Sequence, residues 1–357
     1  MLTKLTMPAK SSEQTSAAQA QSTPERLYVG VDIAKADFAA AIAWGGQTTG
    51  LGKTTNTEEG CCAFMTSIQQ ALQACGAEQV HLVVEPTGGL EAELVEAAYA
   101  AGWLVTLVNT QVVRYWGQGR GRRAKTDRQD ALLLAAYGAS EKPEPQQPLD
   151  ERVAELESLL SHKTDLEQLL RSERNRQGQL RRRTPAAVRQ SVERIISALE
   201  QELAAIDDAI KQLQHQHPFL RRQIDQLRSV PAIGAKSAPR ILVLLHRFLC
   251  RTNGHGAAKQ LVAYLGLDPT PYESGSSLHR HATISRRGNA AIRSLLYFCA
   301  LGGVRGNNPL ATFYHSLLAR GKPKKLALVA CARKAITWAW AVFSHDSFFD
   351  PNLLAKA

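Results

Sequence analysis

The chain has 357 residues and a formal net charge of +11. That length is sufficient for two or three domains with cores of their own. After residue 239 the chain carries sixteen Lys and Arg residues against four Asp and Glu, so its last third holds the whole positive surplus. This distribution favours a domain that faces nucleic acid over a merely soluble basic surface. The six cysteines have no zinc-type spacing, which argues against a zinc-binding class of protein and indicates a reducing compartment.

The two ends of the chain differ in composition from the rest. Residues 1–25 are polar, rich in Ser, Gln and Ala, and lack the apolar segment of a signal peptide, which predicts a disordered leader. Residues 346–357 are expected to be a tail. No apolar run is uninterrupted over the length that a bilayer span requires. The sequence therefore predicts a soluble, cytoplasmic protein with no membrane partner.

Strand and helix signals alternate between residues 26 and 145. Three strands are expected first, followed by helix, strand, helix, strand and helix. This order is that of a ribonuclease-H-like mixed sheet with helices, an α/β fold. In such a fold the first and fourth strands end side by side. The expected elements lie at 27–32, 37–44, 46–55, 58–74, 80–85, 90–101, 103–109 and 127–139.

Four carboxylates stand where predicted strands end or a helix begins. Asp32 closes the first strand and Glu85 the fourth, while Asp127 and Asp130 are three residues apart and share one helix face. A poorly solvated carboxylate is costly unless it is paired or bound to a cation, and Mg²⁺ prefers oxygen ligands. Taken singly, Asp127 could be an N-cap and Asp130 a dipole partner. Together the four acids predict a Mg²⁺ site; Asp37, a fifth candidate, is expected to face solvent.

Residues 146–226 predict two long helices packed as an antiparallel coiled-coil hairpin. Apolar residues from Val192 to Leu213 recur at alternating spacings of four and three, which is typical of a coiled-coil seam. A rigid spacer that can self-associate is favoured over a dimerisation or RNA-gripping arm. Residues 227–345 predict a third, helical domain. Its turn at 231–234 resembles a helix-hairpin-helix element, whose backbone N–H groups can hold a phosphate.

Basic segments are candidates for contact with nucleic acid. A Gly/Arg loop with two aromatic residues, at 114–125, is suited to follow a phosphate backbone and stack on unpaired bases, although a solvated loop is the simpler interpretation. The candidate nucleic-acid-binding residues are Arg114, Tyr115, Trp116, Arg120, Arg122, Arg123, Lys125, Arg128, Gly234, Lys236, Arg280, Arg286, Arg287, Asn289 and Arg293.

A serine precedes a glycine at Ser274. Serines at such places are usually turn residues. Nearby arginines could bind a phosphodiester and stabilise its transition state, which would allow the hydroxyl to attack phosphorus. Chemistry alone favours the turn role, and Ser276 and Ser277 in the same cluster leave the identity of a nucleophile open.

Five ordered segments between residues 26 and 340 resemble one known family. They are Gly-Val-Asp-Ile-Ala-Lys at 30–35, Glu-Pro-Thr-Gly at 85–88, Lys-Thr-Asp-Arg-Gln-Asp-Ala at 125–131, the Pro-Ala-Ile-Gly turn, and the Leu-Gly-Leu-x-Pro to Arg-Arg-Gly-Asn stretch at 265–289. The chain resembles transposases of the insertion-sequence one-ten family, which are described as bridge-RNA-guided serine recombinases with a RuvC-like domain.

The resemblance implies specific roles. It implies that Asp32, Glu85, Asp127 and Asp130 form a RuvC-like DEDD site for one or two Mg²⁺ ions, and that Ser274 forms a transient covalent link to DNA. It also implies a homo-oligomer, a dimer or a synaptic tetramer, in which the serine and the acids come from different protomers. A structured guide RNA would pair with target and donor DNA, while the protein contacts backbone and shape. The setting it implies is the bacterial cytoplasm, at the nucleoid.

Other functions compete with a recombinase. A metal-dependent nuclease of the Holliday-junction-resolvase type would use the same acids with water as nucleophile. An actin-like ATPase or sugar kinase also begins with Gly-x-Asp, but it needs a second sheet and Gly-rich phosphate loops, which the sequence does not show after residue 140. An inactive nucleic-acid-binding derivative of a transposase is a third alternative, against which the presence of all four acids and the serine argues.

Overall fold

The computed structural model describes residues 25–121, 126–274 and 278–352. The predicted leader therefore falls almost wholly outside the described residues, as do Arg122, Arg123, Lys125, Ser276 and Ser277. The chain divides into two compact units, Met1–Pro145 and Gln146–Ala357.

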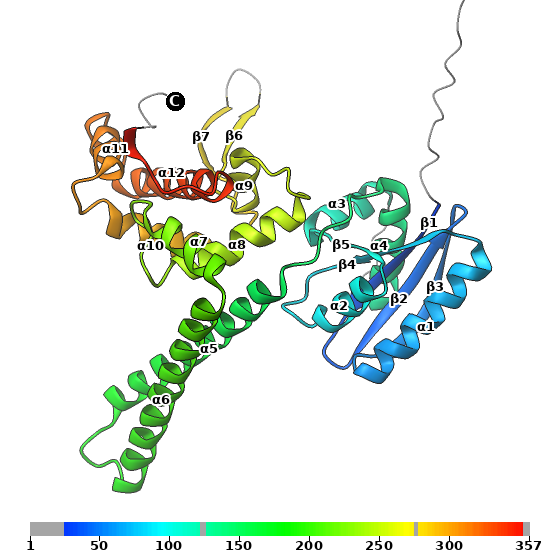
Figure 1. Ribbon diagram of the computed structural model, residues 1–357, viewed down its shortest axis with the longest axis horizontal. Coiled ribbons are helices and arrows are strands. Elements are labelled where there is room, and N and C mark those ends of the chain that lie inside the picture. Colours follow the sequence, from blue (N-terminus) through cyan, green and yellow to red (C-terminus); the bar gives the residue numbers. More distant parts are fainter. Residues whose placement is uncertain (1–24, 122–125, 275–277, 353–357) are drawn as a thin grey trace, which may run out of the picture. The chain divides into compact units, whose positions relative to one another are not determined.

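The first unit is a five-stranded mixed sheet with helices on both faces (Figure 1). The strand order is β3-β2-β1-β4-β5, in which β1, β2 and β3 pair antiparallel and β4 and β5 continue the sheet in parallel with β1. The predicted sequence of strands is confirmed. The strands are β1 (Arg26–Ile33), β2 (Asp37–Trp44), β3 (Gln47–Thr55), β4 (Gln79–Val84) and β5 (Leu104–Leu107), and the helices are α1 (Glu58–Cys75), α2 (Ala92–Ala100), α3 (Thr110–Gly119) and α4 (Asp127–Glu141).

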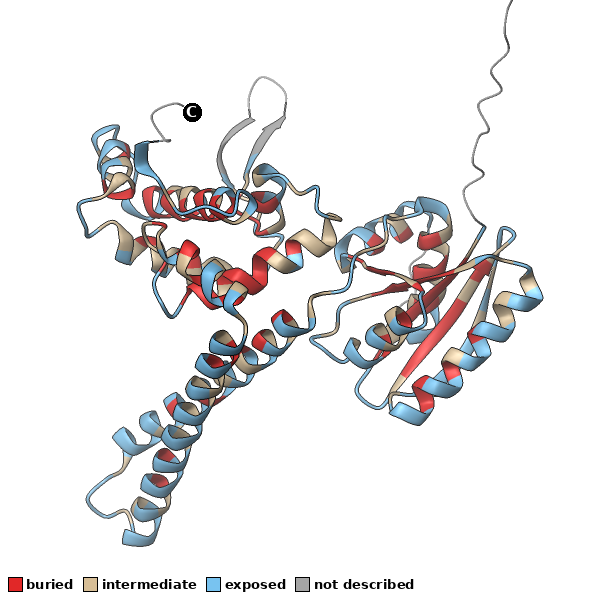
Figure 2. Cartoon of the chain, viewed as in Figure 1, coloured by how far each residue is buried: buried red, intermediate tan, exposed pale blue. Residues whose placement is uncertain are grey.

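The alternation of side chains along β1 assigns the two faces of this sheet. Leu27, Val29 and Val31 pack with residues of α1 and α2, whereas Tyr28 packs with α4 on the opposite face. Both clusters consist of buried residues, and the central strands of the sheet are largely coloured as buried in Figure 2. Every second residue of β1, Asp32 included, therefore belongs to the α4 face.

Helix α3 differs from the expectation. Its residues up to Gly119 had been expected to begin a Gly/Arg loop, but they form an amphipathic helix that Asn109 caps by accepting from the Gln111 N–H. Gly117 allows the close approach of α4, since a Cβ there would lie 2.9 Å from a methyl carbon of Leu133. Helix packing thus overrides the turn signal of the glycines.

The first unit buries one histidine. His81 is fully buried on β4, and its Nε2 lies 2.8 Å from Thr106 Oγ1. Because the Thr106 hydroxyl donates to the Glu144 carbonyl oxygen, Nε2 of the imidazole is the donor to that hydroxyl. Burial, reinforced by the charge of Arg26, lowers the pKa of His81 to about 4.

We expect this histidine to make the first unit acid-sensitive. The unfolded chain takes up the proton near pH 6.5, whereas the folded chain resists it, so the stabilisation is complete above pH 6.5 and is lost as the pH falls toward 4. The loss should reach about 2 kcal/mol at pH 5. Urea unfolding at pH 7.5 and pH 5, with proteolysis of the first unit as the readout, measures this loss in the free energy of unfolding. In His81→Leu the loss between the two pH values should be smaller by about 2 kcal/mol. An equal pH dependence in both proteins would contradict the assignment.

The second unit combines a long helical hairpin with a core that is mostly helical; the expected helical domain also contains a two-stranded antiparallel sheet, which the sequence patterns did not indicate. The hairpin helices run antiparallel, because Arg174 pairs with Glu200 and Lys163 with Asp207. The two long helices expected here are present, whereas the coiled-coil seam stays a prediction. The elements are α5 (Glu151–Gln179), α6 (Ala186–Gln216), α7 (Pro218–Arg228), α8 (Ala238–Arg251), α9 (Ala258–Tyr264), β6 (Pro269–Ser274), β7 (Leu278–Ile284), α10 (Ala290–Gly303), α11 (Pro309–Ala319) and α12 (Lys324–Ser344).

The base of the hairpin is continuous with the helical core. Val153 and Leu156 of α5 belong to the same apolar cluster as Leu227, Leu242 and Ile336. A domain boundary at residue 226 stays a prediction. The unit's largest core therefore includes the first turns of α5.

Helix α12 meets the length and composition of a membrane span, with a mean hydropathy of 1.4, although Arg333 and Lys334 interrupt its apolar run. Over half of that apolar window, 56%, is buried within the protein. Cys331, Ile336 and Ala339 are fully buried in the core cluster. A core helix of a soluble protein passes the same test, so this helix is weak evidence for a membrane location.

Candidate functional site

Two of the predicted acids leave neighbouring strands at the same end of the sheet. β1 and β4 pair in parallel with Val31 opposite Val84, so Asp32 and Glu85 follow at adjacent positions. Both are half-buried. Glu85 Oε1 accepts a 2.5 Å hydrogen bond from the hydroxyl of Thr110, the first residue of α3. The structure thus brings these two positions together.

The backbone of α4 lies directly on β1. A Cβ at Gly30 would lie 2.2 Å from the Ala135 nitrogen and 2.4 Å from the Ala131 oxygen, so only glycine permits this contact. Further back, Gly138 of α4 lies beside Tyr28. The helix therefore runs antiparallel to β1. Asp32, two residues after Gly30, consequently lies beside the first turn of α4.

That first turn carries the other two acids. Asp127 and Asp130 begin α4, which Thr126 caps by accepting from the Gln129 N–H at 3.3 Å. Asp127 is exposed and Asp130 is half-buried. All four acids therefore belong to one end and one face of the sheet, although they come from three segments far apart in the sequence.

A lysine that the sequence did not single out binds this group. The Lys53 ammonium lies 2.9 Å from Asp127 Oδ2 and 3.3 Å from Asp37 Oδ1, and these hydrogen bonds raise its pKa. Asp37, expected to face solvent, is half-buried and paired. In the sheet Lys53 stands opposite Ala39, which stands opposite Asp32. The strand register alone shows that Lys53, Ala39 and Asp32 form one row across β3, β2 and β1.

The donor atoms fit a hard divalent cation. All are carboxylate oxygens, and Asp127 already holds a cationic group, the ammonium of Lys53. Within the described residues no three Asp, Glu, His or Cys side chains stand close enough together to hold a metal ion. The Lys53–Asp127 pair is exposed to solvent and therefore weak, so exchange of the ammonium for a metal ion costs little.

Ser274 lies in the second unit, at the end of a β-hairpin. It pairs with Leu278 as the last residue pair before 275–277, which lie outside the described residues. At the hairpin base a Cβ on Gly266 (φ 67°) would lie 2.6 Å from the Arg287 nitrogen. Gly288 is equally tight, since its Cβ would lie 2.3 Å from the Tyr264 oxygen. The two glycines therefore allow tight packing at the base of the hairpin. Ser274 lies roughly 17 Å from Pro269 at this base, at about 3.3 Å per strand residue.

The predicted arginines around this hairpin have different environments. Arg286 and Arg287 are exposed at its base, and Arg286 has a positive φ of 58°. Arg293 Nη1 donates to the carbonyl oxygens of Leu265 at 3.3 Å and Gly288 at 2.5 Å, so it supports the base. Asn289, another predicted contact, caps α10. The side chain of Arg280 lies outside the described residues. A phosphate contact here is best supported for Arg286 and Arg287.

The aromatic residues of α3 divide into one enclosed and one open ring. The Trp116 indole donates to Glu141 Oε1 at 2.7 Å, and the Arg120 guanidinium lies 4.1 Å from the centre of its ring. Tyr115 is 69% exposed, and Arg114 beside it is exposed as well. Tyr115 is therefore the ring with a free face for stacking.

Arg128 and the turn at Gly234 complete the predicted contacts. The Arg128 Nε lies 3.4 Å from the position of a Cβ on Gly50, so its guanidinium extends over β3. Gly234 N donates to Ser237 Oγ at 3.0 Å, which closes the turn before α8.

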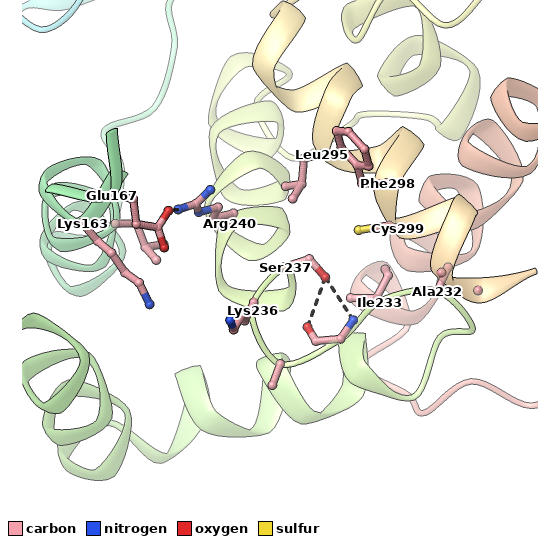
Figure 3. Close-up of a pocket in the computed structure, with 15 residues that line it drawn as sticks. Lys163, Glu167, Ala232, Ile233, Lys236, Ser237, Arg240, Leu295, Phe298 and Cys299 are labelled. Carbon is pink, nitrogen blue, oxygen red and sulfur yellow. Dashed lines mark hydrogen bonds and ion pairs between the residues drawn. The ribbon is translucent and has the colours of Figure 1, made fainter. Parts of the chain in front are cut away.

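The turn borders a cavity of about 700 Å³ (Figure 3). Lys163, Lys236 and Arg240 line it, together with the exposed ring of Phe298. Glu167 pairs with Arg240 at 3.3 Å. A helix-hairpin-helix role for the turn stays a prediction.

Comparisons with known proteins connect both units to mobile DNA. A family profile described as a transposase matches residues 29–185, and a second, described as the transposase IS116/IS110/IS902 family, matches residues 224–315. A pilin gene-inverting protein of Moraxella lacunata is 30% identical over 337 residues, which cover 92% of this chain and 99% of the relative. That of Moraxella bovis matches equally. An uncharacterized 43.6 kDa protein of insertion element IS110 from Streptomyces coelicolor is 28% identical over 165 residues, 45% of this chain and 37% of the relative. The mixed sheet is consistent with a DEDD nuclease-like fold.

Proposed function

The chain belongs to the IS116/IS110/IS902 family of transposases, and on that premise we propose that it exchanges DNA strands through a covalent phosphoserine with the help of Mg²⁺. It is a DNA recombinase or transposase of an insertion element, as the family and its gene-inverting relatives indicate. The proposal adds the chemistry by which the strands are cut and rejoined.

The observation that carries the proposal is the meeting of Asp32 and Glu85 at adjacent strand ends beneath the first turn of α4. The DEDD family match implies the use of a divalent metal. Asp32, Glu85, Asp127 and Asp130 would hold it. A bound ion of this kind stabilises the attacking and leaving oxygens of a phosphoryl transfer. We propose one or two Mg²⁺ ions, because all the donors are carboxylates.

Ser274 is the proposed nucleophile. Its Oγ forms a bond to the scissile phosphorus while the P–O bond to the leaving DNA oxygen breaks, and that oxygen takes up a proton. The phosphoserine ester conserves the bond, so a hydroxyl of the exchanged strand can reverse the reaction without external energy. Exposed Arg286 and Arg287 at the hairpin base, roughly 17 Å from Ser274 along the strand, are suited to bind phosphates of the same DNA away from the scissile bond.

The resemblance to this transposase family also suggests which partners the protein has. We propose a structured guide RNA that selects donor and target DNA by base pairing, with the protein contacting backbone and shape. We also propose a homo-oligomer, a dimer that pairs into a synaptic tetramer, in the bacterial cytoplasm. Sequencing the RNA that co-purifies with the protein tests the guide directly, and recovery of only random cellular RNA would contradict it.

A denaturing gel distinguishes this chemistry from a nuclease that uses water. We expect a protein–DNA adduct that survives detergent, forms with Mg²⁺ and not with EDTA, and is absent from Ser274→Ala. Cleaved DNA without any adduct would support the nuclease alternative. An adduct that persists in Ser274→Ala would transfer the role to another hydroxyl of the hairpin.

Tyr115 should bind unpaired bases. Tyr115→Ala should weaken binding of a single-stranded oligonucleotide by about 1–3 kcal/mol, because one base would lose its stacking partner. Trp116→Ala is the matched control, since its ring is already covered by Arg120 and bonded to Glu141. Trp116→Ala should lower the unfolding temperature and should bind the single-stranded oligonucleotide as tightly as the wild type does. Fluorescence anisotropy and thermal melts measure both effects, and the reverse pattern would contradict the assignment.

A further inference from the structure

The far end of the α5–α6 hairpin is rich in arginine. Between residues 171 and 194 the chain has eight arginines, no lysine, and only two acids, Glu173 and Glu193. The segment covers the end of α5, the turn, and the start of α6. We call this set the arginine tip: Arg171, Arg174, Arg176, Arg181, Arg182, Arg183, Arg189 and Arg194.

Three members of the tip have structural partners. Arg174 pairs with Glu200 at 2.7 Å and Arg176 with Glu173 at 3.7 Å. Arg189 Nε donates to the Thr184 carbonyl oxygen at 3.4 Å, and its Nη2 donates to the Arg181 carbonyl oxygen, which fixes the turn.

The other five are exposed to solvent and have no carboxylate partner within the described part of the chain. Figure 2 shows this end of the hairpin as largely exposed. They are Arg171, Arg181, Arg182, Arg183 and Arg194.

Helix stability does not explain this arrangement. Cations stabilise the C-terminal end of α5 but oppose the dipole at the N-terminal end of α6, whose first turn has no acidic residue. Adjacent like charges also repel one another. Guanidinium groups bind phosphate oxygens through two parallel hydrogen bonds, which an ammonium group does not do. A tip built only from arginine therefore fits a polyanion whose charges are phosphates.

The size and chemistry of the tip favour a double helix. From Arg171 to Leu180 the helix rises about 14 Å, which matches about four base pairs at 3.4 Å each. Single strands are usually held by aromatic rings, and residues 163–216 contain no Phe, Tyr or Trp. The exposed apolar residues in this part of the hairpin, Leu169, Val188 and Ile195, are all aliphatic.

We propose that the arginine tip binds the phosphate backbone of a double-stranded nucleic acid, either a helical segment of RNA or duplex DNA. The inference depends on a chain that acts on nucleic acid, but it does not depend on the serine or on the metal. Its failure would therefore leave the strand-exchange chemistry intact, and the failure of that chemistry would leave the tip intact.

Salt-dependent binding tests the proposal. The full-length variant R181Q/R182Q/R183Q removes three exposed charges and keeps Arg189, which holds the turn. The control K211Q/R222Q/R228Q removes three charges from exposed residues of the same unit that pair with Asp208, Asp346 and Asp225. Fluorescence anisotropy with a DNA duplex and an RNA duplex of one sequence, over a range of NaCl concentrations, gives the slope of log K against log salt.

We expect the slope for the tip variant to fall by about two to three, since each lost phosphate contact contributes about 0.9. The control should retain the wild-type slope, and far-UV circular dichroism should show equal helix content in all three proteins. A reduced slope on one duplex alone identifies the partner, and equal reductions identify backbone binding common to both. Unchanged slopes on both duplexes, or an equal reduction in the control, would overturn the proposal. Ser274→Ala, measured in parallel, should bind as the wild type does.

Discussion

Asp127→Ala should reduce recombination at least about a thousandfold, equivalent to roughly 4 kcal/mol of transition-state stabilisation. The variant removes a proposed metal ligand from the first turn of α4 and leaves the helix itself intact. Its N-cap, Thr126, is unchanged. DNA and RNA binding should stay within a few-fold of the wild type, because the carboxylate repels phosphate when no metal is bound. The measurement is the frequency of recombined junctions from a plasmid that carries the chain's own gene with its flanking DNA.

The matched control for Asp127 is Asp37. Both carboxylates bind the same Lys53 ammonium, and both are removed with the same change of charge. Asp37→Ala should keep recombination within about threefold, because the proposal assigns it no metal. Equal losses in the two variants would mean that the Lys53 network, and not a ligand at Asp127, supports activity.

Ser274→Ala addresses the other unit in the same assay. Recombination should be abolished while binding persists, since the hydroxyl is the proposed point of covalent attachment. Recombination at the wild-type level would remove the covalent step from the proposal. The acids and the serine are thus separable by experiment.

Sequence patterns predicted the positions of the acids because these depend on local signals. Apolar runs that end in a carboxylate indicated that Asp32 and Glu85 lie at strand ends. The parallel pairing of β1 with β4 confirms that these two strands end side by side. Lys53 was missed because its row depends on register. β2 and β3 shift between Ala40 and Ala41, and no local pattern shows which residues then stand opposite.

Other differences arise where tertiary packing competes with local propensity. The glycines near residue 117 indicated a loop, yet Gly117 serves the close contact of α3 with Leu133. Arg293 was expected to face nucleic acid, yet it binds backbone carbonyl groups of the hairpin base. The arginine tip was hidden because the acids elsewhere in the first two thirds of the chain balance its charge. A charge count over thirds of the sequence averages out a cluster of this size.

Gly30→Ala should be the most disruptive single-methyl change in the first unit. The new Cβ would lie 2.2 Å from the Ala135 nitrogen and 2.4 Å from the Ala131 oxygen, both of them backbone atoms of α4 that cannot rotate away. The helix must therefore lift from β1 and take Asp127 and Asp130 away from Asp32. Overpacking of this kind costs about 3 kcal/mol or more. We expect a lower urea midpoint for the first unit and recombination as low as in Asp127→Ala.

Alanine substitutions at two further glycines serve as graded controls for the destabilisation expected in Gly30→Ala. Gly138→Ala meets side-chain atoms of Val83 and Tyr28 at 2.8 and 2.9 Å, which can shift, so its cost should be smaller. Gly119→Ala meets nothing within 4 Å and should leave stability unchanged. Urea unfolding of the three variants gives the order of cost, and recombination should follow the same order. A Gly30→Ala protein as stable as Gly119→Ala would show that α4 does not rest on β1, and the proposed convergence of the four acids would then lose its structural basis.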